Sequence, residues 1–182
     1  MIVPRDASVV LTPDGDLVSE GDGPARLWPY TQAWWRPWRS TRPELVDPVN
    51  GMVLRAGPAA VLAALAGGGW ERPPDGAVHR TWIDGRGRRM VDHIALGDRS
   101  ERVHVRVWAF GPHTLFAAHH EVMDERGHHV VVSWDAARAT VGEALHRAGF
   151  AGLAPTGPVT LPALRDVPGD GRVWRWVGDA AG

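Results

Sequence analysis

Three histidines and one glutamate fall on neighbouring strand-like runs in the middle of the chain. His104 lies among alternating valines, His119 and Glu121 lie in the following run, and His129 lies in the run after that. Side chains alternate between the two faces of a β-strand, so the parity of their residue numbers tells which of them share a face. Imidazole and carboxylate groups are ligands of Zn²⁺, Fe²⁺ and Mn²⁺, and they also act as acids and bases near neutral pH.

The first of two short turns predicts how these runs pair. Gly111-Pro112 is short enough to be a two-residue hairpin turn. That turn predicts an antiparallel pair in which His104 lies opposite His119 and Arg102 lies opposite Glu121. Directly opposed Cβ atoms are about 5 Å apart, so these side chains are expected to be in contact.

The second turn is predicted to pair Met123 with Gly127, which places Glu121 opposite His129. We call the resulting group of four side chains the His–Glu patch: His104, His119, Glu121 and His129. The opposite face is predicted to be apolar and covered by helices, with Val103, Val105, Val107, Phe116, Ala118, Val122, Val130, Val132 and Trp134. A slip by one residue in either hairpin would mix histidine into that face, so burial supports the register.

Three interpretations of the His–Glu patch stay open from the sequence. The four side chains could hold a divalent metal, Zn²⁺, Fe²⁺ or Mn²⁺, with one position left for water or substrate. Without metal they could be catalytic as general acid and base. In both cases Arg102, Arg106 and Trp108 are predicted to bind substrate, because a guanidinium holds an anionic group well. The third interpretation is a solvated, histidine-rich sheet face without a site.

The composition excludes several kinds of chemistry. The 182 residues include 20 basic residues, all of them arginine, and no cysteine. The chain therefore has no thiolate nucleophile, disulfide, iron–sulfur cluster, Schiff-base lysine or GxxxxGK[ST] phosphate loop. A formal charge of −1 argues against a nucleic-acid partner. No apolar run reaches the length of a transmembrane segment and the N-terminus lacks a signal-peptide pattern, so we expect a cytoplasmic protein.

The elements that position the patch predict an α+β domain over residues 45–182. We expect a mainly antiparallel sheet of about five to six strands with two helices packed on one face. The helices are expected at 58–66, which starts with proline and ends in three glycines, and at 135–148. The predicted strands are 52–54, 78–83, 90–96, 103–110, 113–123, 128–134 and 172–177.

The two predicted helices align with each other at one constant offset. Gly69-Trp70 follows the first as Gly149-Phe150 follows the second, and Val61 aligns with Val141. This similarity indicates a duplicated strand–helix unit.

Residues 1–44 differ in composition from the rest of the chain. A small hairpin is expected in 1–24, because two apolar runs flank the turn Thr12-Pro13-Asp14-Gly15-Asp16. Residues 27–43 are rich in tryptophan and proline and cannot form a long helix beyond Pro37. This segment is predicted to wrap over the domain, or to dock a protein partner or a second copy of the chain.

The order of several motifs between residues 45 and 150 resembles a known family. These motifs are Asp47-Pro48-Val49-Asn50, Gly69-Trp70, Gly85-Arg86, Asp92, the strand His104-x-Arg106-x-Trp108, Glu121 and Asp135-x-x-Arg138. Together they resemble the LssY C-terminal domain family of bacterial proteins, whose members are often fused to membrane phosphatase-like or DedA-like regions. The chain departs from that pattern at His119-His120, where the family has a small hydroxyl residue. The resemblance implies that His104, Arg106, Glu121 and Asp135 fall on motif positions, and it implies no particular reaction.

The sequence thus leaves functions of different classes open. The first is a small-molecule enzyme that acts on an anionic substrate through the His–Glu patch and its arginines, with metal-assisted hydrolysis as one form. The second is a non-catalytic module that binds an anionic metabolite or a lipid headgroup. The third is an assembly protein that docks through its tryptophan-rich segment.

Overall fold

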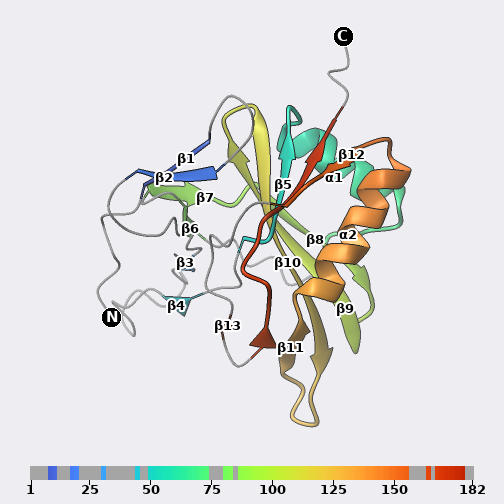
Figure 1. The fold of residues 1–182 in the computed structure, drawn as a ribbon. Coiled ribbons are helices and arrows are strands. Elements are labelled where there is room, and N and C mark those ends of the chain that lie inside the picture. Colours follow the sequence, from blue (N-terminus) through green and yellow to red (C-terminus); the bar gives the residue numbers. More distant parts are fainter. Residues whose placement is uncertain are drawn as a thin grey trace.

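The computed structural model describes residues 49–73, 90–155 and 169–178 in full. Elsewhere it describes the backbone of short strands within residues 8–45, 80–89 and 163–168. Figure 1 shows a central sheet with two helices on one side of it. No helix in these described parts is long and apolar enough to cross a lipid bilayer.

Seven strands form the central sheet. They are β5 (Gly51–Leu54), β8 (Asp92–Gly97), β9 (Glu101–Phe110), β10 (His113–Met123), β11 (His129–Ser133), β12 (Ala151–Leu153) and β15 (Trp174–Val177). Their order is β12-β15-β5-β10-β9-β8, and β11 also pairs with β10. All pairs are antiparallel except β15 with β5, which is parallel. The predicted α+β class with a mainly antiparallel sheet is confirmed.

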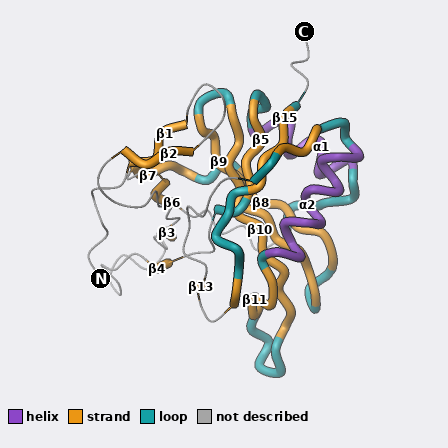
Figure 2. The backbone as a smooth tube through the Cα atoms, viewed as in Figure 1, coloured by secondary structure: helices purple, strands orange, loops and turns teal. Residues whose placement is uncertain are grey.

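Both predicted helices are present, as α1 (Pro58–Gly67) and α2 (Asp135–Arg147), and they cover one face of the sheet (Figure 2). Pro58 occupies the first turn of α1, where its missing N–H has no partner to lose. A glycine after each helix allows the chain to turn sharply there, because Gly69 and Gly149 both adopt positive φ, at 85° and 91°. The aligned ends of the two helices therefore have the same backbone conformation.

The apolar core lies between these helices and the sheet. Val61 and Leu65 of α1 and Val141 and Leu145 of α2 are fully buried there. The sheet side of this core consists of Val53, Ile94, Val105, Val107, Phe116, Ala118 and Trp176. The valines that alternate with His104 and Arg106 therefore face the helices, and the histidines face the other side.

The face of the sheet that carries the histidines is apolar at one end only. Met52, Trp108 and Leu115 are fully buried in a second hydrophobic cluster near the β9–β10 turn. Polar side chains begin with Arg106 on β9 and, after Ala117, with His119 on β10. The second cluster thus anchors the strand ends that precede the polar part of the face.

Short antiparallel pairs complete the described structure. The predicted N-terminal hairpin is confirmed, with β1 (Ser8–Leu11) paired to β2 (Leu17–Glu20). The other pairs are β3 (Tyr30–Thr31) with β4 (Glu44–Leu45), β6 (Arg80–Ile83) with β7 (Arg86–Arg89), and β13 (Ala163–Leu164) with β14 (Val167–Pro168). Apart from the backbone of β3, the tryptophan-rich segment 27–43 lies outside the described residues, and so does its predicted wrapping or docking role.

Several elements differ from the sequence-based expectation. The Arg86–Arg89 segment, which falls between two of the predicted strands, is strand β7. Strand β12 was not predicted, because its three residues are all exposed and carry no alternating pattern. The parallel pairing of β15 with β5 joins distant parts of the chain, and no local pattern indicates it.

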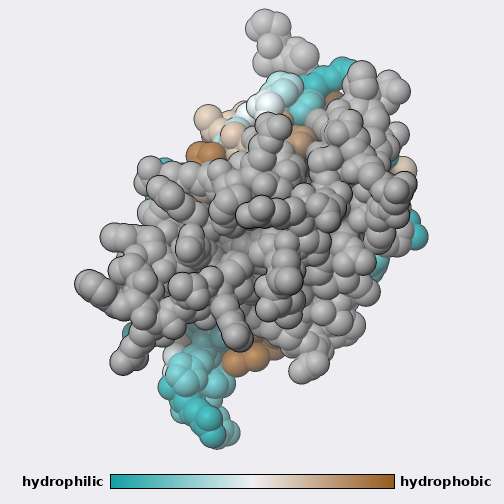
Figure 3. Space-filling view, turned by 90° about the vertical axis from the view of Figure 1, so that its left-hand side faces the viewer, coloured by the Kyte–Doolittle hydropathy of each residue, from teal (hydrophilic) through white to brown (hydrophobic). Residues whose placement is uncertain are grey.

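The predicted cover of Val130 and Val132 by the helices is wrong. Each of these side chains is 44 % exposed. Figure 1 shows the reason, because the end of the β10–β11 hairpin extends beyond α2. In Figure 3 this end of the molecule is a hydrophilic protrusion.

Gly51 offers a test of the packing between β5 and β10. A Cβ at Gly51 would lie 1.9 Å from Cζ of Phe116, whose ring is fully buried and packs against Trp176. We expect Gly51→Ala to lower the free energy of unfolding by about 2–3 kcal/mol, because the ring has no free space to move into. Gly152→Ala on β12 is the matched control, since nothing lies within 4 Å of its added Cβ. Urea unfolding of both variants measures the difference, and equal stabilities would contradict the packing described.

Candidate functional site

The β9–β10 hairpin has the register that the sequence predicts. His104 lies opposite His119, and Arg102 lies opposite Glu121. The imidazole rings of His104 and His119 meet edge to face with centroids 5.0 Å apart. His93 on β8 extends this row, because its ring meets that of His104 edge to face at 5.2 Å.

The predicted register of the second hairpin is wrong by two residues. Glu121 lies opposite Val131, and His129 lies opposite Met123. The turn is longer than expected because Asp124 closes it, accepting hydrogen bonds from the backbone N–H groups of Arg126 and His128 at 2.9 and 2.8 Å. A shift of two residues keeps each side chain on its predicted face. His129 therefore still reaches the patch, with Nδ1 3.2 Å from Oε1 of Glu121.

Asn50 holds β10 in place next to His119. Along one edge, β10 pairs first with β5 and then with β11, which leaves Ala118 between them without a strand partner. The buried Asn50 side chain fills this gap. Its Nδ2 donates to the carbonyl of Ala118 at 2.8 Å, and its Oδ1 accepts from the N–H of Ala118 at 2.9 Å. The backbone that carries His119 is thus fixed by a side chain that the sequence singled out only through the family resemblance.

Three members of the His–Glu patch come together in the sheet. One possible ligand atom from each of His104, His119 and Glu121 lies within 4.8 Å of the others, and all three residues are buried. No other group of this kind occurs among the described residues. Glu121 Oε2 lies 2.9 Å from His119 Nε2, which donates to it because an ionised carboxylate can only accept.

Glu121 is an ionised carboxylate in a buried place. Burial by itself raises its pKa, but the hydrogen bonds and positive charges of His119 and Arg102 outweigh burial and lower the pKa to about 2. Arg102 Nε donates to Oε1 at 2.5 Å. The two carboxylate oxygens therefore have different partners: Oε1 accepts from Arg102, and Oε2 accepts from His119.

His104 is a neutral imidazole at neutral pH. Burial lowers its pKa well below the ordinary value, and the positive charges of Arg106, His119, His93 and Arg102 lower it further. Its Nε2 atom has no hydrogen-bond partner among the residues that the structure describes. A buried nitrogen without a partner is costly unless a ligand satisfies it.

His129 is held by hydrogen bonds at both of its ring nitrogens. Its Nδ1 accepts from Arg102 Nη2 at 2.9 Å, because a guanidinium can only donate, and its Nε2 therefore donates to the carbonyl of Arg99 at 3.1 Å. Both ring nitrogens are thereby engaged. His129 orients Arg102, and it lies outside the group of three possible ligands.

The remaining predicted residues are dispersed around this centre. Arg106 lies on the same face beside His93, and its charge contributes to the low pKa of His104. Trp108 is fully buried in the second hydrophobic cluster. The Asp135-x-x-Arg138 motif joins the start of α2 to the segment before β15, because Arg138 contacts Asp135 at 3.0 Å and Asp170 at 2.9 Å.

Sequence reasoning missed His93 as a neighbour of the site. It falls in a predicted strand, and the turn signal Gly97-Asp98-Arg99-Ser100 that joins β8 to β9 could have indicated how that strand pairs. Both His93 and His119 contact His104, because the register of each neighbouring strand against β9 places them on the same face.

The arrangement has two chemical uses. Two imidazoles and one carboxylate form a ligand set for Zn²⁺ or Fe²⁺, and Arg102 supplies the outer hydrogen bond that usually orients a ligating carboxylate. Without metal, Glu121 and His119 form a hydrogen-bonded acid–base pair. No protein-family model matches the chain, and searches of curated proteins and of solved structures find no similar protein.

Removing the charge of Glu121 tests its role in the buried network. We expect Glu121→Gln to lower the free energy of unfolding by about 3 kcal/mol, because Arg102 then loses the carboxylate that neutralises it. Glu101→Gln is the control, since that side chain is 65 % exposed and its contact with His120 lies at the surface. Urea unfolding at pH 7 with a chelator present compares the two. A loss as small as that of the control would contradict the description of Glu121.

The lowered pKa of His104 predicts a pH dependence of stability. Below about pH 6.5 the unfolded chain takes up a proton at this position and the folded chain does not, so stability falls as the pH falls. We expect His104→Asn to reduce this fall between pH 7 and 5 by about 1 kcal/mol. His128→Asn removes a histidine that is 73 % exposed and should leave the slope unchanged. Chemical unfolding across this pH range, with a chelator present, measures the free energy of unfolding at each pH. Parallel curves of this free energy against pH for wild type and His104→Asn would contradict the lowered pKa of His104.

Proposed function

We propose that the protein binds a divalent metal, Zn²⁺ in the first place, at His104, His119 and Glu121, and uses it to hydrolyse a small anionic substrate. One observation carries the proposal: three buried residues each place a possible ligand atom within 4.8 Å of the other two. One of them, His104, has a ring nitrogen without a partner among the described residues. Two histidines and a glutamate are a ligand set of zinc hydrolases, in which water takes the fourth position.

The protonation states support metal binding. Glu121 is ionised and His104 is neutral, as ligands must be. His119 holds a proton between its Nε2 and Glu121, and a metal would replace that proton. Neighbouring ligands of tetrahedral Zn²⁺ lie about 3.4 Å apart. The 2.9 Å between His119 Nε2 and Glu121 Oε2 is close to that value, and a ligand atom of His104 lies within 4.8 Å of the other two.

The bound metal would supply a water of lowered pKa and a positive charge for the substrate. The residues around it have positioning roles. Arg102 holds Oε1 of Glu121 and leaves Oε2 to the histidine side, and His129 in turn holds Arg102. The edge of His93 packs against His104 and limits how its ring turns.

We further propose that the chain is an LssY C-terminal-like domain. The motif residues Asn50, His104, Arg106 and Glu121 support this, since Asn50 fixes the strand next to the site and the others lie on the site face. The proposed metal would be a feature of this chain, because its His119 stands where the family has a small hydroxyl residue.

Metal content tests the proposed centre directly. Protein purified without a histidine tag, exposed to equal amounts of Zn²⁺, Fe²⁺ and Mn²⁺ and then dialysed, should retain about one equivalent of metal per chain, with Zn²⁺ preferred. His104→Asn and Glu121→Gln should each lower this content at least about tenfold. His120→Ala is the matched control, because His120 neighbours His119 but pairs with Glu101 at the surface.

Two results would overturn the metal proposal. One is wild-type protein that retains none of the three metals, and the other is equal metal content in wild type and in the folded His104→Asn variant. For the reaction, metal-loaded protein is tested on chromogenic phosphate and carboxylate esters. Turnover that disappears in His104→Asn supports hydrolysis, and bound metal without turnover of any ester refutes it.

A further inference from the structure

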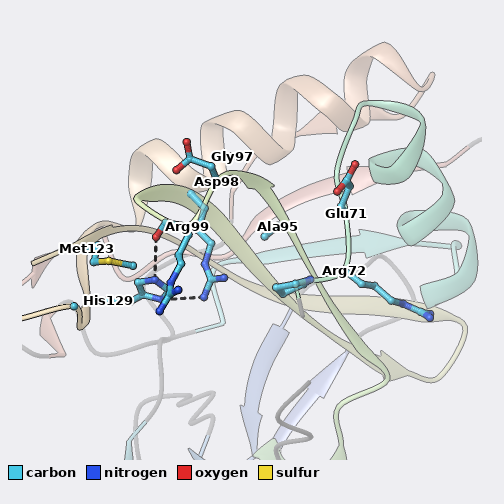
Figure 4. Close-up of a pocket in the computed structure, with 11 residues that line it drawn as sticks. Glu71, Arg72, Ala95, Gly97, Asp98, Arg99, Met123 and His129 are labelled. Carbon is cyan, nitrogen blue, oxygen red and sulfur yellow. Dashed lines mark hydrogen bonds between the residues drawn. The ribbon is translucent and has the colours of Figure 1, made fainter. Parts of the chain in front are cut away.

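A pocket of about 450 Å³ opens beside the candidate metal site, between β8, β9 and the end of the β10–β11 hairpin (Figure 4). It lies on the histidine face of the sheet. Ala95, which pairs with His104, and Arg102, which pairs with Glu121, both line it. Beyond His93, this face of β8 carries Ala95 and then Gly97, and the small Ala95 side chain leaves space that a larger one would fill.

Positive charge gathers at one end of this pocket. Figure 4 shows the side chain of Arg99 extending beside the ring of His129. His129 joins the two arginines, because its Nε2 donates to the carbonyl of Arg99 and its Nδ1 accepts from Arg102. Arg102 is neutralised by Glu121, whereas Arg99 has no ion pair among the described residues. This end of the pocket therefore carries one uncompensated guanidinium next to a second one.

The acidic residues of the pocket do not neutralise Arg99. Asp98 uses Oδ1 to accept from the N–H and the hydroxyl of Ser100 at 2.7 and 2.6 Å and from the N–H of Glu101 at 3.2 Å. Its carboxylate points away from His129 in Figure 4, and Glu71 lies at the opposite end of the pocket. Arg72, also at that end, forms an ion pair with Asp92.

We propose that this pocket binds the oxyanion group of a small organic molecule, a phosphate or a carboxylate, through Arg99 and Arg102. Guanidinium groups bind both oxyanions by paired, charge-assisted hydrogen bonds. Pro73, Ala95 and Met123 line the rest of the pocket and offer apolar contact to the organic part of the ligand. As a substrate site this inference rests on the proposed function, but binding of the anion itself requires no metal.

Arg99 is the specificity-determining residue of this proposal, and Arg102 links the pocket to the metal site. The guanidinium of Arg102 contacts Glu121 through Nε and His129 through Nη2. An anion at Arg99 and Arg102 would therefore lie one side chain away from a metal ligand. This position suits a substrate whose reactive bond is next to its charged group.

Calorimetric titration of metal-free protein at low salt tests the pocket with phenyl phosphate, benzoate, inorganic phosphate and neutral phenol. We expect phenyl phosphate or benzoate to bind more tightly than inorganic phosphate, and phenol not to bind. The relative affinity of phenyl phosphate and benzoate tells which oxyanion the site prefers. Arg99→Gln should weaken binding about tenfold or more. Arg126→Gln, an exposed arginine on the hairpin turn outside the pocket lining, should leave the affinity unchanged.

The His104→Asn variant separates this proposal from the metal proposal. It should bind phenyl phosphate as wild type does, while Arg99→Gln should retain the metal content of wild type. Absence of binding by every anion up to ~10 mM would overturn the pocket proposal whatever the metal content is. Equal affinities of wild type and Arg99→Gln would overturn it as well.

Discussion

The register of the β9–β10 hairpin is the constraint on which the rest of the structure depends. A two-residue turn places His104 opposite His119 and Arg102 opposite Glu121. Because side chains alternate, the same register turns Val105 and Val107 toward the helices. A slip of one residue would bury charged groups in the core and expose valines, so the core and the site stabilise the same pairing. Asn50 adds a second restraint on β10, since it replaces a missing strand at Ala118.

The buried Glu121 carboxylate organises the charges of the site. A carboxylate out of water is unfavourable unless cations and donors surround it. Arg102 and His119 provide them, and their position follows from the register. Burial and the same cations lower the pKa of His104 and disfavour a second proton on its ring, which stays neutral. The site thus contains two kinds of imidazole: His119, whose Nε2 donates to Glu121, and His104, whose Nε2 has no partner among the described residues.

The sequence predicted the features that local chemistry determines. Alternation and the Gly111-Pro112 turn were sufficient for both faces of β9 and β10, and proline and glycine signals located both helices. The predicted register of the second hairpin was wrong because Asp124 closes a longer turn by accepting backbone hydrogen bonds, which the number of turn residues does not reveal. His93 is positioned by the short β8–β9 turn, which was not used to derive a register, and the parallel β5–β15 pair depends on contact between distant segments. The separation of His129 from the ligand group depends on hydrogen-bond partners, which no spacing rule includes.

The proposed metal and anion sites share Arg102, and this determines the sign of their coupling. The positive charge of Arg102, and of Arg99 beyond it, opposes a cation at Glu121. An anion bound to the two guanidinium groups would offset that charge and favour the metal. Linkage requires the reverse effect to be equal, so the metal would favour the anion by the same factor. Substrate and metal would therefore bind cooperatively without any change in fold, because His129 and Glu121 already hold Arg102 between the two sites.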